Sequence, residues 1–275
     1  MSIVAYYFEP GTEITIDWGD GVVQSYGGVD GEGTIVDPET EQVEHIEAIH
    51  NYVEDGLYDL NVTGHITGVL NQFYNLVDLK QWGETAIDRF GADPGQNLKS
   101  LFEDVTGFTI SAVDAPTFPE NTSLERLFSG CIDFNSSFNH WDTDNVINLR
   151  SFLEGCIEFN QPINGLRTGR VSDMGWMLAE CVRFNQPINA LDTVSCTNME
   201  AMLYFAEVFN QPMDQLNTSN VQTMFSMFNG AAAFDQDISM WPVANVGECK
   251  WFAENSPINN TEKMPALTCQ LTTSQ

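Results

Sequence analysis

The chain has 275 residues, and its 43% hydrophobic content is enough for a packed core and too high for a disordered chain. Its 39 acidic and 10 basic residues give a formal net charge of −29 at pH 7, which repels nucleic acid and anionic membranes at long range. We therefore expect no nucleic acid and no membrane insertion. The charge is typical of a protein kept soluble in a saline medium, with specific cation binding as the less favoured alternative.

Residues 1–67 are predicted to form an antiparallel β module. The run ITIDWGDGVVQSY alternates apolar and polar residues on both sides of Asp20-Gly21, which is a hairpin signal, and GLYDLNVTGHI alternates again further on. Asp17 and Asp20 are weak candidates for calcium ligands. Their spacing is not that of an EF-hand and a hairpin turn explains the Asp–Gly pair, so we predict no metal and no other cofactor. In the second run, the side chains expected to point inward are Leu57, Leu60, Val62 and Ile66.

The chain opens with MSIVAYYFEPGTEI, which has no basic segment and no apolar stretch as long as a signal peptide or a membrane span. This opening predicts that the chain does not reach a surface as an ordinary secreted precursor.

Residues 68–120 predict irregular repeats that cap a longer array. The interval from Phe108 to Phe134 is longer by a single residue than the interval from Phe134 to Phe159, which the later repeats keep. Phe102 precedes Phe128 by the same longer interval. Irregular end repeats are expected because they must cover the exposed core of the array. Residues 261–275 match no repeat and are predicted to be a polar tail.

Residues 121–260 repeat at a fixed period without insertion or deletion, as marked by Phe134, Phe159, Phe184, Phe209 and Phe234. A fixed period of this length predicts coils that bury their apolar faces against one another. The spacing V-x-x-M-x-x-M predicts a short helix with one buried stripe, and the following FNQPIN predicts a short extended segment because its proline blocks a helix. The expected fold class is therefore an α/β solenoid of leucine-rich-repeat-like coils, each with a short strand and a short helix.

The six cysteines are predicted to be apolar core residues. Three of them share one position of the repeat, which Ala206 and Ala231 continue, and Cys249 falls in a column of methionines. The absence of a CxxC pair argues against structural zinc. Six of the ten methionines fall in the buried stripe and predict core filling rather than a plastic binding groove.

Two polar columns are predicted to have different roles. An Asn follows the repeating Phe in four coils, with Asp235 in the fifth, and a stacked amide column predicts a structural ladder that satisfies backbone groups. The two positions between the inward Ile and Leu columns vary, and they predict an outward polar strip that binds a partner, with plain solvent exposure as an equal alternative. The candidate binding residues of this outer strip are Asn139, His140, Asn164, Asn189, Asp214 and Gln215.

The repeat resembles the BspA-type branch of the leucine-rich repeats. More narrowly, it resembles a family of unknown function with repeats of this same length, first noted in mycoplasma surface lipoproteins. This resemblance covers residues 68–260 and rests on FNQPIN, L-D-T and V-x-x-M-x-x-M. TIDWGDG, with His50, Tyr52 and GLYDLNVTG, resembles a PKD-like β-sandwich, which implies an immunoglobulin-like N-terminal module. The repeat family implies adhesion at a cell or virion surface and brings no catalytic residues.

The sequence predicts a protein that is not an enzyme, since it has no GxSxG, HExxH, P-loop or GxGxxG motif. We expect a virion structural or adhesion protein, such as a phage fibre or a capsid or tail decoration protein, because virion proteins need no export signal. Its N-terminal module would attach to other virion or surface proteins, and its repeats would contact a host surface protein or glycan. The alternatives are a bacterial cell-surface adhesin or carbohydrate-binding module and a hydrolase of surface glycans, and a homo-oligomer is also possible.

Overall fold

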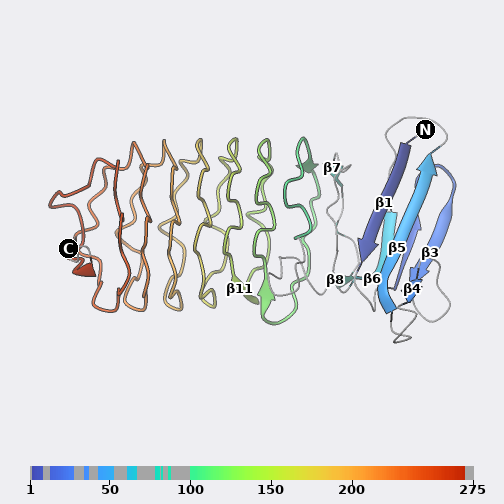
Figure 1. Cartoon of the computed structure of the whole chain (residues 1–275), viewed down its shortest axis with the longest axis horizontal. Helices are drawn as coiled ribbons and strands as arrows, with labels where there is room; N and C mark the ends of the chain where they lie inside the picture. The colour runs from blue at the N-terminus through green and yellow to red at the C-terminus, as the bar shows by residue number, and fades with distance from the viewer. Residues whose placement is uncertain are drawn as a thin grey trace.

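The computed structural model describes residues 2–8, 13–27, 34–36, 43–52, 61–66, 78–80, 82, 86–87 and 100–269. Strands near the N-terminus form a two-sheet module at one end of the long axis of the molecule (Figure 1). A row of stacked units follows along that axis and ends at the C-terminus, drawn in red. We refer to the units of residues 100–269 as the repeat stack.

The N-terminal module contains two sheets. The antiparallel sheet has the order β1-β5-β4, with β1 at Ser2–Phe8, β4 at Thr34–Val36 and β5 at Val43–Tyr52. The other sheet has the order β3-β2-β6-β8, with β2 at Glu13–Asp17, β3 at Val23–Gly27, β6 at Asn61–Ile66 and β8 at Ala86–Ile87. In this second sheet β2 is antiparallel to both neighbours, and β8 joins β6 in parallel.

The hairpin predicted around Asp20-Gly21 is confirmed. Strands β2 and β3 pair as far as Asp17 and Val23, and the Trp18 amide donates to the Val22 carbonyl at 3.0 Å. Gly21 has a φ of 93°, in the left-handed region that glycine enters without steric cost. Of the side chains expected to point inward further on, Leu57 and Leu60 lie outside the described residues, and Val62 and Ile66 lie in β6 without described side chains.

The repeat stack is joined by short parallel pairings. Strand β7 (Asp78–Leu79), which precedes the repeat stack in sequence, pairs with β9 (Thr109–Ile110), and within the stack β10 (Thr122–Ser123) pairs with β11 (Val146–Asn148). Beyond β11 the row continues as single parallel bridges that join equivalent positions of successive units, in the order Asn148, Asp173, Asn198, Thr223 and Glu248. Each unit therefore lies beside the next in the same orientation.

The core of the repeat stack is a column of phenylalanine rings. Phe134 stacks on Phe159 with ring centroids 6.0 Å apart, and the rings continue to Phe184, Phe209 and Phe234 at centroid distances of 5.9 Å. All five rings are buried, as are the six methionines of the predicted stripe. The buried residues form one continuous cluster that reaches from Ile14 in the N-terminal module to Ile258. The predicted inward columns are thus confirmed.

The predicted α/β solenoid, with a strand and a helix in every coil, is wrong. The described residues contain no α-helix, and the strands that pair within the repeat stack are two or three residues long. Turns, irregular segments and single bridges make up the rest of each unit. The segment predicted to be a helix is a series of tight turns.

Two residues in each of six successive units have left-handed backbone angles, and they explain why no helix forms. An α-helix needs consecutive residues near φ −63°, so one left-handed residue interrupts it. The first left-handed column has φ between 49° and 60° and consists of Arg126, Ser151, Trp176, Ala201, Ser226 and Trp251. The second left-handed column has φ between 51° and 76° and consists of Gly130, Gly155, Glu180, Phe205, Gly230 and Asn255. This conformation costs a non-glycine residue roughly 1–2 kcal/mol.

The stack replaces helical hydrogen bonds with bonds between units. The amides of Ser151, Leu153 and Gly155 donate to the carbonyls of Gly175, Met177 and Ala179 of the next unit at 2.8–3.0 Å. The amides of the residues between these three each donate to the carbonyl three residues earlier in the chain, and each of these bonds closes a tight turn. These turns bury every third or fourth side chain, which is the spacing that also predicts a helix.

A disulfide lies at the C-terminal end of the stack and corrects the prediction that all cysteines are free. Cys249 pairs with Cys269, and their Cα atoms are 5.7 Å apart. Residue 269 lies beyond the regular period, so the repeat pattern gave no indication of a partner. Met264 and Leu267 pack, partly buried, against the core in the same segment. Residues 256–269 therefore cover the last unit. The other four cysteines are free and buried, as predicted.

Candidate functional site

The amide column that follows the phenylalanines is a structural ladder, as predicted. The Oδ1 atom of Asn160 accepts from the Asn185 amide at 3.0 Å and from the Gln186 side chain at 3.1 Å. The same pair of bonds joins the neighbouring units, from Asn135 to Asp235. The side-chain oxygens of this column are therefore already used to hold units together.

The predicted outer strip is also partly used in bonds between units. Asn139 donates to the Asn164 side chain at 3.2 Å, and its own oxygen accepts from the Gly165 amide at 2.6 Å. His140 is exposed and contacts the Asp114 carbonyl at 3.1 Å through Nε2. The structure therefore brings Asn139 and Asn164 together.

The second half of the strip forms a similar cluster. Asn189 donates to Asp214 at 3.0 Å and accepts from the Gln215 amide at 2.9 Å. Hydrogen bonds from the Gln215 and Asn189 side chains hold the pKa of the Asp214 carboxyl below its ordinary value. A lowered carboxyl pKa stabilises the folded state above the unfolded pKa, and this contribution is lost as pH falls through the folded pKa. These contacts are therefore intact at neutral pH.

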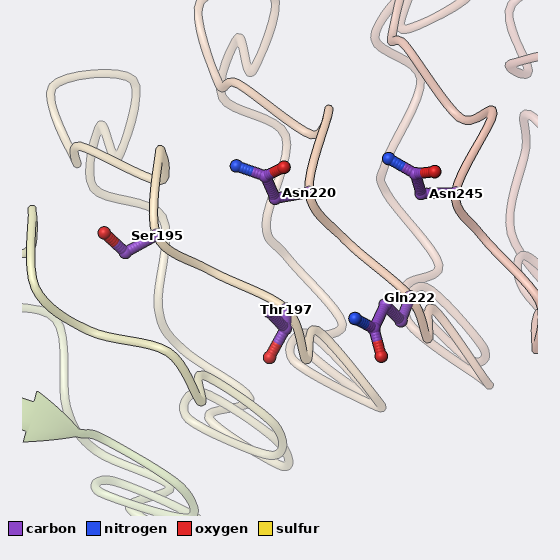
Figure 2. Close-up of a pocket in the computed structure, with 5 residues that line it drawn as sticks. All are labelled: Ser195, Thr197, Asn220, Gln222 and Asn245. Carbon is purple, nitrogen blue, oxygen red and sulfur yellow. The ribbon is translucent and has the colours of Figure 1, made fainter.

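A polar groove, which the sequence did not predict, lies on the bridge row of the last regular units. Its volume is about 440 Å³, and it is lined by side chains of three successive units: Ser195, Thr197, Asn220, Gln222 and Asn245. Figure 2 shows the two asparagines at equivalent places on neighbouring units, with Thr197 and Gln222 repeating in the same way beside them. Each residue takes its place from the period of the repeat, so the groove presents the same kind of group at regular intervals.

The groove presents side-chain amide groups that can form hydrogen bonds with a ligand. Asn220 and Asn245 each donate Nδ2 to a carbonyl of the preceding unit, at 2.8 and 2.7 Å, which fixes their orientation and leaves their oxygens available. Gln222 is exposed, and its side-chain amide has no partner in the described part of the chain. None of the lining residues carries a charge. The groove therefore offers amide oxygens and one free amide to a neutral ligand.

The remaining candidates for chemistry have structural explanations. Asp17 and Asp20 each accept a backbone amide within the hairpin loop, at 3.0 and 3.1 Å, which confirms their role as turn residues. Among the described residues, no group of three or more His, Cys, Asp or Glu side chains could hold a metal ion. No helix in the described part of the chain is long and apolar enough to span a bilayer.

The free thiols are unreactive because they are buried. Burial raises the pKa of Cys131 and of Cys196 to about 12, and it also raises the pKa of Cys156 and of Cys181 well above the ordinary value of a thiol. The Cys131 thiol also donates to the Phe102 carbonyl at 2.9 Å. Because the thiolate is the nucleophilic form, these side chains are core residues without catalytic use.

A family model described as "Mycoplasma protein of unknown function, DUF285" matches residues 96–208 and again residues 166–264. Together the two matches cover more than half of the 275-residue chain. The chain belongs to this family. The resemblance of the repeat to a mycoplasma-type repeat family is thereby confirmed, whereas the PKD-like character of the N-terminal module lies outside the matched residues. No curated protein and no solved structure matches the chain.

Four successive units of this DUF285 protein also have a buried threonine that sequence reasoning missed. The hydroxyl of each of these threonines donates to a carbonyl 24 residues further on, at 2.8–3.1 Å. The signal was a Thr repeated at the same position of four units: Thr143, Thr168, Thr193 and Thr218. The groove was harder to predict from the sequence, because neither of its columns repeats one residue type. One column holds Asn, Arg and Ser, and the other holds Ile, Ser, Thr, Gln and Gly.

Proposed function

We propose that this DUF285 protein is a non-enzymatic attachment protein that binds neutral glycans in the groove of its repeat stack. The observation that carries the proposal is the uncharged groove with its outward amide oxygens and the free Gln222 amide. Sugar hydroxyls both donate and accept hydrogen bonds, so an amide and hydroxyl lining is complementary to them. A volume of about 440 Å³ lies in the range of small-molecule sites.

The negative net charge of the chain favours neutral glycans over anionic glycans as ligands. A net charge of −29 repels sialylated or sulfated sugars, whereas it leaves neutral sugars unaffected. Because the lining of the groove carries no charge, we propose that a neutral glycan makes its first contacts there. The outer strip from Asn139 to Gln215 is proposed as a secondary surface, because several of its side chains already join units.

The proposed setting is a virion surface, with a bacterial cell surface as the alternative. The N-terminal module, proposed to be PKD-like, would attach the protein to other virion or surface proteins and leave the repeat stack exposed. Its position at one end of the long axis supports this arrangement (Figure 1). Separation of particles, membranes and soluble protein from the source, followed by detection of the chain, decides between the two settings.

A glycan array that carries both neutral and acidic glycans tests the binding function. We expect the protein to bind neutral glycans and to release them unchanged, as judged by mass spectrometry of the recovered glycan. Gln222→Ala should weaken this binding without a change in melting temperature, since the Gln222 side chain has no partner in the described part of the chain. Met240→Ala, at a side chain 91% exposed outside the groove, is the matched control and should bind normally.

Three results would overturn the proposal. Glycan cleavage would make the protein a hydrolase. Binding restricted to anionic glycans would contradict the electrostatic argument. Binding that Gln222→Ala leaves unchanged would place the glycan outside the groove.

A further inference from the structure

Five aromatic side chains gather along the edge of the stack that carries the left-handed columns. We define the aromatic patch as Trp176, Tyr204, Phe205, Phe225 and Trp251. Ring centroids are 5.4 Å apart between Trp176 and Tyr204, 4.6 Å between Tyr204 and Phe205, and 5.2 Å between Phe225 and Trp251. The Phe205 ring also covers Gly230, where an added Cβ would come within 2.8 Å of the ring. The patch therefore spans four successive units.

The aromatic patch is not part of the core. None of its five rings belongs to the buried cluster, and the side chains of Phe205 and Trp251 are 40% and 48% exposed. The apolar side chain of Val208 is also exposed close by in sequence, at 44%. The other three rings are half-buried, so the patch is an aromatic surface with two exposed rings, and exposed apolar surface of this kind can serve as a contact for a partner.

The backbone conformation at the patch residues supports the same conclusion. Trp176, Phe205 and Trp251 lie in the left-handed columns with φ of 60°, 51° and 59°, a conformation that disfavours bulky side chains. Other units place small residues at the same two positions, namely Ser151, Ala201, Ser226, Gly155 and Gly230, and the remaining units hold Arg126, Glu180 and Asn255. The left-handed turns therefore form without aromatic side chains, and the fold does not require the rings at these positions.

The surroundings of the patch specify a cationic partner. Glu180, Glu207 and Glu254 are exposed in the same units, and the whole chain carries a net charge of −29. One cation already occupies the patch, since the Lys250 ammonium lies 4.3 Å from the centroid of the Trp251 ring. Cations are attracted to aromatic faces, and the planar arginine guanidinium also stacks on them.

We propose that the aromatic patch binds an arginine-rich segment of a partner protein. Guanidinium groups would stack on the exposed rings, and the surrounding glutamates would pair with the remaining charge. This surface is separate from the glycan groove, and the inference does not depend on the proposed function.

The test compares the full chain with a triple variant, Trp176→Ser with Phe205→Gly and Trp251→Ser. Each replacement is a residue that other units hold in the same column, and the net charge does not change. The probe is a fluorescent arginine-rich peptide, with a lysine-rich peptide of equal length and charge beside it, in about 0.15 M salt. Met240→Ala controls for the loss of an exposed apolar side chain, and Gln222→Ala controls for the groove.

We expect the wild-type chain to bind the arginine peptide more tightly than the lysine peptide. The triple variant should bind the arginine peptide about tenfold more weakly, as the loss of two or three exposed cation–π contacts implies. It should melt at the same temperature or higher, and both controls should bind normally.

The inference is overturned if the wild-type chain does not bind the arginine peptide or if the triple variant binds it as well as the wild type does. It is also overturned if the triple variant melts at a lower temperature, which would make the rings structural. Loss of glycan binding rather than peptide binding in the triple variant would assign the patch to sugars.

Discussion

The interior of the repeat stack and its left-handed edge follow the same period but differ in their side chains. In the interior, one kind of residue returns in every unit, as with the phenylalanine rings stacked from Phe134 to Phe234. Along the edge, one backbone conformation returns with different side chains, so that Gly155, Glu180 and Phe205 occupy equivalent places. The comparison indicates that interior side chains stabilise the stack, whereas edge side chains vary between units and include those that we propose to contact a partner.

The largest expected effect comes from a charge placed in the interior. Met202 is fully buried, so Met202→Asp should lower the free energy of unfolding by at least about 4 kcal/mol, because the carboxylate has no partner there. Met240→Asp introduces the same charge at a side chain 91% exposed and should have almost no effect. Chemical denaturation of both variants checks the difference, and equal losses would contradict the assignment of interior and surface columns.

A smaller loss is expected at the end of the stack. The Cys249–Cys269 disulfide closes a loop with a sequence separation of 20 residues, so Cys269→Ser should cost about 3 kcal/mol. Thermal melting checks this value. Reduction of the wild-type protein should give the same loss, and reduction of the variant should give no further loss. A variant as stable as the oxidised wild type would show that the disulfide does not stabilise the end of the stack.

Substitutions in the two polar columns should cause smaller losses of stability, and these losses should differ between the columns. Asn185→Ala removes the acceptor for the Asn210 amide and the Gln211 side chain and should cost about 1–3 kcal/mol. Asn189→Ala removes the acceptor for the exposed Gln215 amide, which water can replace, and should cost less than about 1 kcal/mol. The hydrogen bonds of Asn189 to Asp214 and Gln215 are the reason to expect a small loss rather than none. The reverse order in urea denaturation would refute the distinction.

The smallest effect is a gain in stability at the edge. Glu180 is exposed with φ 58°, and Glu180→Gly should stabilise the protein by up to about 1 kcal/mol, because relief of the left-handed backbone exceeds the entropy that glycine adds to the unfolded chain. Gly155→Ala is the matched opposite. The added Cβ meets no atom closer than 3.6 Å, so a loss of about 1 kcal/mol would come from φ alone. Calorimetric melting should show the two variants on opposite sides of the wild type.

The sequence predicted the interior because its columns repeat a residue type. Phenylalanine, asparagine and methionine return at the same positions in successive units, and each has one use in a stack. The left-handed edge escaped prediction because only glycine indicates a positive φ, and the second column holds glycine in some units and Glu180, Phe205 or Asn255 in others. Where glycine is absent from the column, the sequence does not indicate a left-handed residue, and the spacing of three to four residues between buried side chains predicts a helix.

The groove escaped prediction for a different reason. Ser195, Asn220 and Gln222 look like ordinary surface residues in one unit, and only the stacking of three units places them around one hollow. Cys269 lies outside the period, so its pairing with Cys249 depends on how the last segment folds back over the stack.

The most direct test of the division between binding columns and structural columns compares two glutamines. The side chain of Gln222 lies in the groove without a hydrogen-bond partner in the described residues, whereas the side chain of Gln211 donates to Asn185 at 3.1 Å in the structural ladder. Binding to a neutral glycan and melting temperature should be measured for Gln222→Ala and Gln211→Ala side by side. We predict that Gln222→Ala loses binding at an unchanged melting temperature and that Gln211→Ala keeps binding at a lowered one. The opposite pattern would contradict the account.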